Sequence, residues 1–380
     1  MSSLQPDIDY IKQILHTLMQ IPSPSGMTDE IVKFVCKELD QLQMPYELTR
    51  RGAIRASLDG RSDFIRRAVA AHLDTLGAMV KSIQSDGRLG VVPIGFWSSR
   101  FAEGARVTIY TDQGKHRGTI LPRKASGHVY NEEVDTQPTQ WASVEVRIDE
   151  PCTTLEGVWA LGIRVGDFIS VDSQPEFLDN GFINGRHLDD KAGVACILAA
   201  LKKIRDENLP VPVGCSILFT ISEEVGVGAS HVLHGNVAEM VSVDNGTIAP
   251  NQNTCEYGAT LAMQDSSGPF DRHLTRFLIS LCQEHAIEYS RDVFLHYRSD
   301  AASALEAGND IRTALICFAL DASHGYERTH IRSLQNVTQL LTAYMTSQPL
   351  FKSDENVFGS DSEFPIIANS LEQKPAGREG

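Results

Sequence analysis

The chain has 380 residues, of which 42% are hydrophobic and 22% are charged, and its formal net charge at pH 7 is -15. This length allows a large buried core and predicts two domains, or one domain with a large insertion. The acidic balance, with Lys and Arg scattered along the chain, argues against a nucleic-acid partner, because phosphate binding requires clustered basic residues.

The seven cysteines are spread along the chain without a C-x-x-C pair. An odd number without regular spacing is not typical of a disulfide framework, and it favours a reducing compartment. The opening segment MSSLQPDIDY lacks the basic and apolar regions of a signal peptide, and no apolar run approaches the length of a membrane span. We therefore expect a cytoplasmic protein without a membrane partner.

Two amphipathic helices are predicted near the start of the chain. Apolar residues recur at helical spacing over residues 7–20, and the Pro-Ser-Pro-Ser-Gly run at 22–26 ends this helix. Thr28 stands where an N-cap residue would precede a second apolar stripe, which ends near Leu42. Short β-like runs then lead into RRAVAAHLD at 66–74.

From about residue 80 to residue 177 the pattern changes to short alternating segments, such as RVTIYTD and SVEVRID. Gly, Asp and Pro turns separate them, which predicts a small β-barrel or sandwich inserted into another domain. After residue 186 apolar strands alternate with helices, the pattern of a mixed or parallel sheet covered on both faces.

The predicted fold class is therefore α/β, with a mixed β-sheet sandwiched by helices and an inserted small β-barrel domain. We place the main domain at residues 1–80 and 178–350 and the inserted β domain at 81–177. Residues 351–380 are polar and charged with weak periodicity, so we expect a C-terminal tail there.

Five segments carry metal-ligand residue types where a predicted strand ends or the next helix begins. They are AHLD at 71–74, LDDKAG at 188–193, SEEVG at 222–226, VSVDNG at 241–246 and ALDASH at 319–324. The carboxyl ends of strands in an open α/β sheet border one crevice, so distant residues can converge there. Two divalent ions that share a site use His nitrogens and carboxylate oxygens, with one carboxylate bridging them. The candidate ligands are His72, Asp189, Glu224, Asp244 and His324.

Each of these motifs also has a plain structural explanation. His72 and Asp74 could be a buried histidine hydrogen-bonded to a carboxylate. Asp189 or Asp190 could cap the helix that they open. Asp244 could form a turn before the Asn-Gly pair that follows it.

The other two segments are equally open when taken alone. Glu223 and Glu224 could be an ordinary solvated pair, although they follow a strongly apolar strand. Two histidines, His324 and His330, compete within SHGYERTH at 323–330. The joint order of the five segments, all at strand ends, favours a metal site over the separate explanations.

The combined motifs resemble the TET and glutamyl aminopeptidases, which are dinuclear metallopeptidases of the clan MH type. The similar segments are HLDTLG at 72–77, LDDKAG, SEEVGVGAS at 222–230, VSVD at 241–244, RSDAASA at 298–304 and TALICFALDASH at 313–324. The last segment aligns without a gap to the strand that ends in the family's final histidine ligand, which favours His324 over His330. The resemblance runs from the N-terminal helices through the final helix and leaves out the tail.

The resemblance implies a ligand set for two divalent ions per subunit. Asp189 would bridge the ions, His72 and Asp244 would complete the shell of one, and Glu224 and His324 would complete that of the other. Zinc is favoured by affinity order, with cobalt or manganese as alternatives, because supply and geometry also decide.

The resemblance further implies that Glu223 is the general base and that Asp74 orients His72. The main domain would then be the catalytic domain of an aminopeptidase that acts on short peptides. The inserted β domain would join subunits into a homo-oligomer.

One departure from the family lies directly after His324, where the chain reads HGYERTH and typical members continue with Ser-Pro and a hydrophobic residue. A subgroup with a similar segment resembles proteins associated with synthesis of an N-acetylated glutamine dipeptide amide, a bacterial osmoprotectant. Two alternatives therefore stay open: a hydrolase of N-acylated or amidated small dipeptides, and a catalytically inactive assembly protein. A glycan hydrolase using Glu223 and Glu224 is disfavoured, because adjacent residues rarely achieve the ~5–9.5 Å separation across one bond that this chemistry needs.

Overall fold

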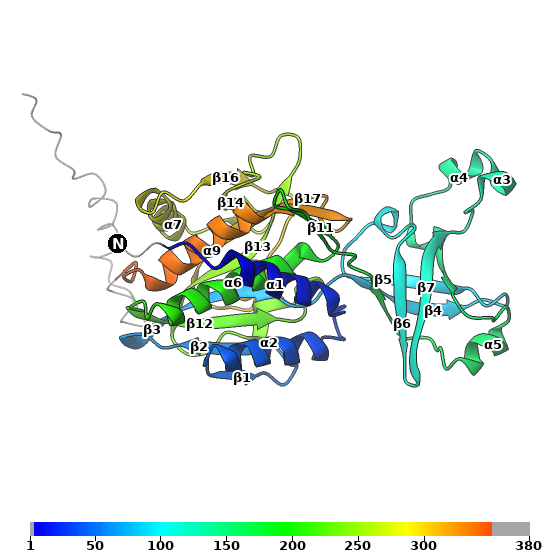
Figure 1. The fold of residues 1–380 in the computed structure, drawn as a ribbon, viewed down its shortest axis with the longest axis horizontal. Helices are drawn as coiled ribbons and strands as arrows, with labels where there is room; N and C mark the ends of the chain where they lie inside the picture. Colours follow the sequence, from blue (N-terminus) through cyan, green and yellow to red (C-terminus); the bar gives the residue numbers. More distant parts are fainter. Residues whose placement is uncertain (1–3, 352–380) are drawn as a thin grey trace, which may run out of the picture.

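The computed structural model describes residues 4–351 and contains two parts of different architecture. One part is built around a mixed sheet of 12 strands, and the other is a closed β-barrel that projects from one end of it (Figure 1). The predicted fold class, α/β with an inserted barrel, is confirmed. Of the tail predicted at 351–380, residues 352–380 lie outside the described part of the chain.

The large sheet places four parallel strands at its centre. Its main path is β1 (Tyr46–Leu48), β2 (Ile54–Leu58), β12 (Val213–Thr220), β3 (Ser62–His72), β13 (Val237–Ile248), β17 (Arg312–Asp321), β18 (Glu327–His330), β11 (Phe182–Gly185) and β10 (Glu176–Phe177). Three further strands extend it beside β17: β14 (Ala259–Asp265), β15 (Gly268–Pro269) and β16 (Tyr289–Val293). Strands β12, β3, β13 and β17 pair in parallel, so their carboxyl ends lie along one edge of the sheet.

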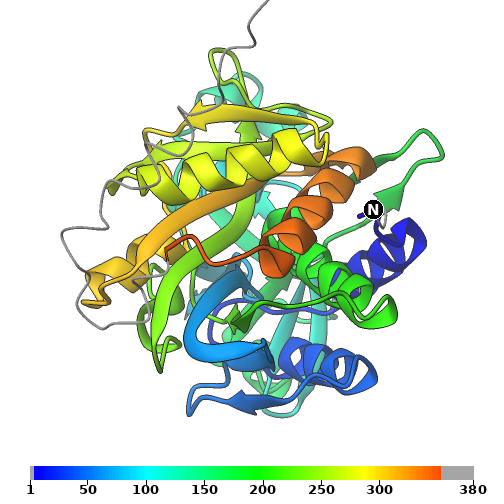
Figure 2. The same cartoon turned by 90° about the vertical axis from the view of Figure 1, so that its left-hand side faces the viewer.

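Helices cover both faces of this sheet. They are α1 (Ile8–Gln20), α2 (Asp29–Gln41), α6 (Leu188–Asp206), α7 (Arg272–Glu284), α8 (Asp300–Glu306) and α9 (Ile331–Thr346). Helices α6 and α9 contact the central strands, and α8 contacts β3, β13 and β17. Figure 2 shows α8 across the sheet from α6 and α9. Thr28 occupies the predicted N-cap position of α2, but its side chain makes no cap hydrogen bond within the described residues.

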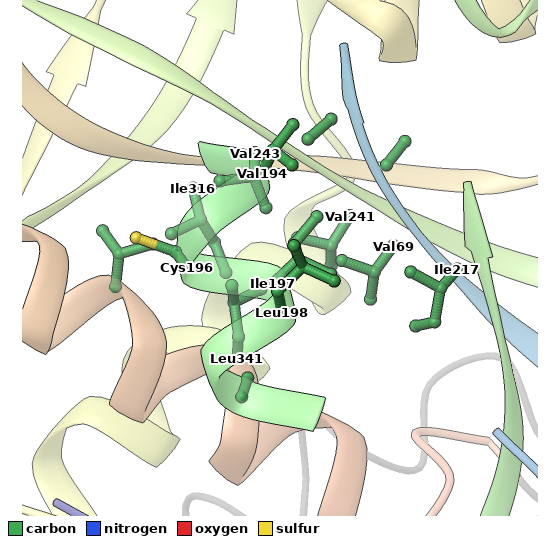
Figure 3. Close-up of a cluster of buried hydrophobic side chains, with 14 of the residues drawn as sticks. Val69, Val194, Cys196, Ile197, Leu198, Ile217, Val241, Val243, Ile316 and Leu341 are labelled. Carbon is green, nitrogen blue, oxygen red and sulfur yellow. The ribbon is translucent and has the colours of Figure 1, made fainter. Parts of the chain in front are cut away.

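The main core lies between α6, α9 and the central strands. Helix α6 is buried from Leu188 to Leu201, and the charged residues of its last turns are partly or fully exposed. Figure 3 shows Ile197 and Leu198 of α6 packed towards Val69 of β3 and Val241 of β13. This packing fixes the start of α6 relative to the ends of the strands.

The barrel has a core of its own. Its strands are β4 (Gly77–Ile83), β5 (Leu89–Ile94), β6 (Arg106–Thr111), β7 (Gly114–Pro122), β8 (Val144–Ile148) and β9 (Phe168–Val171), and they close in the order β4-β5-β8-β7-β6-β9. Short helices in its connections are α3 (Gly127–Tyr130), α4 (Glu133–Thr136) and α5 (Leu155–Ala160), with 3₁₀ turns at Ser99–Phe101 and Trp141–Ser143. A third 3₁₀ turn, Gly228–His231, lies in the main part. Residues such as Val107, Ile120 and Ile169 fill the barrel interior.

Within residues 4–351, no helix is both long enough and apolar enough to cross a bilayer.

The packing around α6 gives a stability prediction. Leu198→Ala is expected to lower the free energy of unfolding by ~2–5 kcal/mol, because it leaves a cavity in the main core. Urea unfolding followed by circular dichroism measures the change. Leu48→Ala is the matched control: Leu48 is 52% exposed in β1, so the shift should stay within ~0.5 kcal/mol. Equal losses in the two variants would contradict the buried position of Leu198.

Candidate metal centre

The five predicted ligands converge where the central strands end. His72 is the last residue of β3, Glu224 follows β12, and His324 follows β17. Asp189 lies in the first turn of α6, whose start faces the same edge. The convergence follows from the parallel pairing of β12, β3, β13 and β17, which places their carboxyl ends together.

Asp244 differs from its predicted position. Strand β13 does not end there, because it continues to Ile248 in register with β17, so the alternative of a turn at Asp244 is wrong. The neighbouring strand β3 pairs with β13 only as far as Ser242. Asp244 therefore lies beyond the end of this pairing, where its side chain can reach the crevice next to His72.

The ligand-type atoms form two groups that share Asp189. His72, Asp189 and Asp244 make one group, Asp189, Glu224 and His324 make the other, and the atoms within each group lie within 4.8 Å of one another. The His72 Nε2 atom is 3.1 Å from Asp189 Oδ1, and the His324 Nε2 atom is 3.4 Å from Asp189 Oδ2. Each carboxylate oxygen of Asp189 thus faces a different histidine, the arrangement expected of a bridging ligand.

The competing histidine lies elsewhere. His330 occupies the N-cap position of α9, and its Nδ1 atom accepts a hydrogen bond from the N–H of Arg332 at 3.1 Å. Its Nε2 atom is 3.0 Å from the carbonyl oxygen of Asn180. Both ring nitrogens are therefore engaged away from Asp189, and of the two histidines the geometry brings only His324 into the site.

The site concentrates buried negative charge. Burial and the charge of Asp189 raise the pKa of Asp244 to about 8, and the same two causes hold the pKa of Glu224 well above its ordinary value. Burial also raises the pKa of Glu223, against the opposing effect of His72. Burial would raise the pKa of Asp189 too, but hydrogen bonds with His324 and His72 lower it.

This donor set fits divalent cations. Carboxylates that are buried together repel one another and lose hydration, so they need positive charge beside them. Imidazole nitrogens and carboxylate oxygens are ligands that zinc accepts. Each group of three, with Asp189 shared, supplies the three protein ligands of an open site.

Asp74, predicted to orient His72, contacts the histidine ring through its main-chain oxygen and not through its carboxylate. The Nδ1 atom of His72 is 2.8 Å from the main-chain oxygen of Asp74 and 3.7 Å from its carboxylate. The carboxylate instead accepts the main-chain N–H groups of Glu223 at 3.1 Å and Glu224 at 3.3 Å, and the hydroxyl of Ser25. Asp74 therefore holds both the histidine ligand and the Glu-Glu pair.

Asp190 does not act as the predicted helix cap. Its Oδ2 atom accepts the main-chain N–H of His72 at 3.1 Å, which ties the start of α6 to the end of β3. His187, whose φ of 70° is left-handed, precedes α6, and the backbone angles of Asp189 and Asp190 are not yet helical. Gly193 leaves room for this arrangement, since a Cβ atom there would lie 2.2 Å from the Asp190 carboxylate.

Two contributing residues were not predicted from the sequence. The Nδ2 atom of Asn245 donates to Asp189 at 2.8 Å and to Asp244 at 3.1 Å. Asn245 therefore links Asp189, which belongs to both groups, to Asp244, which belongs to one. The carboxylate of Glu327 accepts main-chain N–H groups from Leu188, Asp189 and His324. In the sequence, Asn245 directly follows Asp244, and Glu327 lies three residues after His324. These positions were the only sequence signals, because neither an asparagine nor a glutamate by itself indicates a residue that supports a metal site.

The barrel also reaches the site. The main-chain oxygen of Phe96, in the connection after β5, lies 2.9 Å from the Nδ1 atom of His324. A hydrogen bond at this nitrogen fixes the imidazole tautomer that leaves Nε2 free for a metal. One of the two histidines is thus oriented by the main part and the other by the barrel connection.

A cavity of about 870 Å³ opens over the cluster. Asp189, Glu223, Glu224 and Asp244 line its floor, and Glu223 stands beside His72 with 3.8 Å between the carboxylate and Nε2. A carboxylate beside a candidate metal pair, at the bottom of an open cavity, is placed to exchange protons with a bound water or substrate.

Comparisons with known proteins relate this chain to aminopeptidases. The model of the M42 glutamyl aminopeptidase family matches residues 52–340. The putative aminopeptidase YhfE of Bacillus subtilis (strain 168) is 38% identical over 348 residues, covering 91% of this chain and 99% of that protein. The glutamyl aminopeptidase of Lactococcus lactis is 28% identical over 221 residues, covering 57% of this chain and 60% of that protein.

Solved structures show the same fold. A TET aminopeptidase from the archaeon Thaumarchaeota archaeon SCGC AB-539-E09 superposes with a TM-score of 0.81 at 21% identity, covering 88% of this chain and 96% of that one. The Pyrococcus horikoshii TET1 peptidase gives a TM-score of 0.78 at 22% identity, covering 88% and 99%. The latter protein is described as assembling into a tetrahedron or a large octahedral shell.

The charges of the cluster predict how metal binding depends on pH. Burial opposes the protonated form of His324, but contact with Asp189 and Glu224 raises its pKa to about 10, and the pKa of Asp244 is about 8. Both groups therefore carry protons at neutral pH, and these protons must leave before a metal binds. Raising the pH removes the competing protons, so zinc affinity should increase roughly ten-fold per pH unit for each proton displaced.

Calorimetric titration with zinc in buffers of different ionisation enthalpy counts the protons released. An affinity that stays constant between pH ~6 and ~8, where these groups hold protons, would contradict the assignment of His324 and Asp244 as ligands.

Proposed function

The chain belongs to the M42 glutamyl aminopeptidase family and is a metal-dependent aminopeptidase, and we propose that it uses two divalent ions to cleave N-terminal residues from short peptides. The observation that carries this proposal is the pair of ligand groups sharing Asp189. His72 and Asp244 complete one group, and Glu224 and His324 complete the other. Zinc is the favoured metal by affinity order, with cobalt and manganese as alternatives.

The chain's own residues supply the proton transfers. Bound divalent ions supply Lewis acidity, which polarises a carbonyl and lowers the pKa of water towards ~7. Glu223 takes one proton from the attacking water as the water oxygen bonds to the scissile carbon. It then returns that proton to the leaving nitrogen as the C–N bond breaks. Asp74 keeps Glu223 in place through its hydrogen bond to the main-chain N–H.

The two ligand groups favour a free N-terminus. A free α-amine has a nitrogen lone pair that could bind a metal ion in an open position, whereas the nitrogen of an N-acylated substrate is an amide and a poor ligand. Family membership and this chemistry therefore favour an aminopeptidase over a hydrolase of N-acylated or amidated dipeptides. The complete set of ligands and a base disfavours a catalytically inactive assembly protein.

The cavity walls favour an uncharged N-terminal side chain. Phe96, Val225 and Leu295 line the opening and are 80%, 42% and 68% exposed, so they offer apolar surface to a substrate. Arg298 also lines the cavity, but its guanidinium pairs with both oxygens of Glu306 at 2.7 Å. That pairing reduces the positive charge available to an acidic side chain.

We propose that the subunits form a homo-oligomer through the inserted β domain, residues 81–177, while residues 1–80 and 178–350 form the catalytic domain. The barrel exposes Val129, Trp159 and Val165, apolar side chains of the kind that interfaces cover. The assembly described for the Pyrococcus horikoshii relative supports the same proposal.

A cytoplasmic location is also proposed, on the basis of cysteine chemistry. All seven cysteines are free thiols: Cys36, Cys152, Cys196, Cys215, Cys255, Cys282 and Cys317. Secreted proteins commonly oxidise their cysteines, so seven free thiols fit a reducing compartment better.

Glu223→Gln tests the activity and the base together. Zinc-, cobalt- and manganese-loaded wild type is assayed on Leu-Gly and on N-acetyl-Leu-Gly, and cleavage of the free-amine peptide alone is expected. The variant should keep its metal by elemental analysis and lose ~10²–10⁴-fold in kcat, because a positioned base contributes that much. Normal turnover in a metal-loaded variant would remove Glu223 from the base role. Preferential cleavage of the acetylated peptide would overturn the aminopeptidase assignment.

Glu306→Gln tests substrate selection. The wild type is expected to prefer leucyl over glutamyl peptides, and removing the partner of Arg298 should raise the glutamyl-to-leucyl ratio of kcat/KM roughly ten-fold, or ~1.4 kcal/mol. Glu256→Gln breaks a similar ion pair with Arg328, at 2.7 Å and outside the cavity residues, and serves as the control. A ratio that changes equally in both variants, or in neither, would count against the specificity proposal.

A further inference from the structure

The last histidine of the cluster sits in an unusual turn. Between β17 and β18, Ala322 and His324 have φ angles of 55° and 67°, which place both in the left-handed region. This region is unfavourable for residues with a Cβ atom and persists where surrounding contacts hold it. The Gly325 N–H closes the turn on the Ala322 oxygen at 2.9 Å, and a Cβ atom at Gly325 would lie 3.0 Å from that oxygen.

Glu327 holds this turn from inside the protein. It is the first residue of β18 and only 2% exposed. Its Oε1 atom accepts the main-chain N–H of His324 at 2.9 Å. Its Oε2 atom accepts those of Leu188 at 2.7 Å and Asp189 at 3.3 Å. One carboxylate therefore joins the turn after β17 to the start of α6, two segments that are far apart in the sequence.

We propose that Glu327 is a positioning residue that sets the separation of Asp189 and His324 by binding the main chain of both. This inference rests on the proposed function, in which these two residues are metal ligands. Phe96 fixes the rotation of the His324 ring, and Glu327 fixes the backbone that carries the ring. Arg186 supports the same turn, since its Nη1 atom donates to the Gly325 oxygen at 3.3 Å.

The two carboxylate oxygens of Glu327 bind different segments, one the turn at His324 and the other the start of α6. A residue with a single acceptor oxygen could therefore not fully replace it. Removing both oxygens leaves three N–H groups without their acceptor, and a buried donor without an acceptor is unfavourable. The left-handed turn would then lose the contact that opposes its relaxation. His324 is expected to move away from Asp189 and Glu224 more than His72 does, because His72 is held by Asp74 and Asp190.

Zinc titration of Glu327→Ala and Glu327→Gln tests this role. Wild type should bind two zinc ions per chain. In the alanine variant the affinity for one of them should fall ~10–100-fold, the effect typical of losing a group that orients a ligand. Glutamine keeps a single acceptor oxygen and should restore part of the affinity, so it also provides an answer if the alanine variant does not fold. Cobalt absorption spectra should show one altered site and one that is nearly unchanged.

Glu38→Ala and Glu38→Gln are the matched controls, since Glu38 is 8% exposed in α2 and away from the cluster. A glutamate with only a structural role would lower the melting temperature and leave zinc affinity unchanged, as expected for Glu38. Wild-type zinc affinity in both Glu327 variants would overturn the positioning role. Wild-type protein that binds no zinc would overturn the proposed function itself, so the two failures are distinguishable.

Discussion

The geometry of the candidate metal site depends on the carboxylate of Asp189, because both groups of ligand-type atoms share it. Asp189 presents its two oxygens to two histidines that come from strands on either side of the sheet centre, and it does so in a buried crevice where like charges accumulate. Buried carboxylates that face one another are unstable without positive charge. Two other features of the site support this arrangement. Parallel strands end at one edge of the sheet, and a second layer of polar groups lies behind the proposed ligands.

That second layer works mostly through the main chain. Asp74, Asp190 and Glu327 each use a side-chain carboxylate to bind main-chain N–H groups of segments that carry the proposed ligands or the proposed base. Because main-chain N–H groups belong to the backbone itself, these bonds fix the position of a segment and not only the rotation of one side chain. The buried carboxylates of these three residues thereby gain hydrogen-bond donors, and the main chain that carries the proposed ligands is held in place.

The grouping of the five candidate ligands could be predicted from the sequence because their residue types are specific and because strand ends can be located from apolar patterns. The supporting residues could not. The carbonyl oxygen that orients His72 is present in every residue, so no residue type signals it. From the sequence, Asn245 has the character of a turn residue and Glu327 that of a surface acid. Only the fold shows that β13 continues past Asp244 and that β18 returns beside α6. The choice of His324 over His330 rested on an alignment, and the fold supplies the reason, since His330 is occupied at the start of α9.

The connection after β5 links the barrel to the part of the molecule that holds the candidate metal site. Phe96 in this connection places its main-chain oxygen 2.9 Å from His324 and lines the cavity, so the barrel and the candidate metal site share one contact. Coupling between two equilibria is reciprocal, so if a shift of the barrel changed metal affinity through this contact, metal binding would bias the barrel position by the same coupling free energy. In a homo-oligomer joined through its barrels, metal loading and subunit association would therefore be linked equilibria, with each subunit's metal content contributing to the stability of the whole particle.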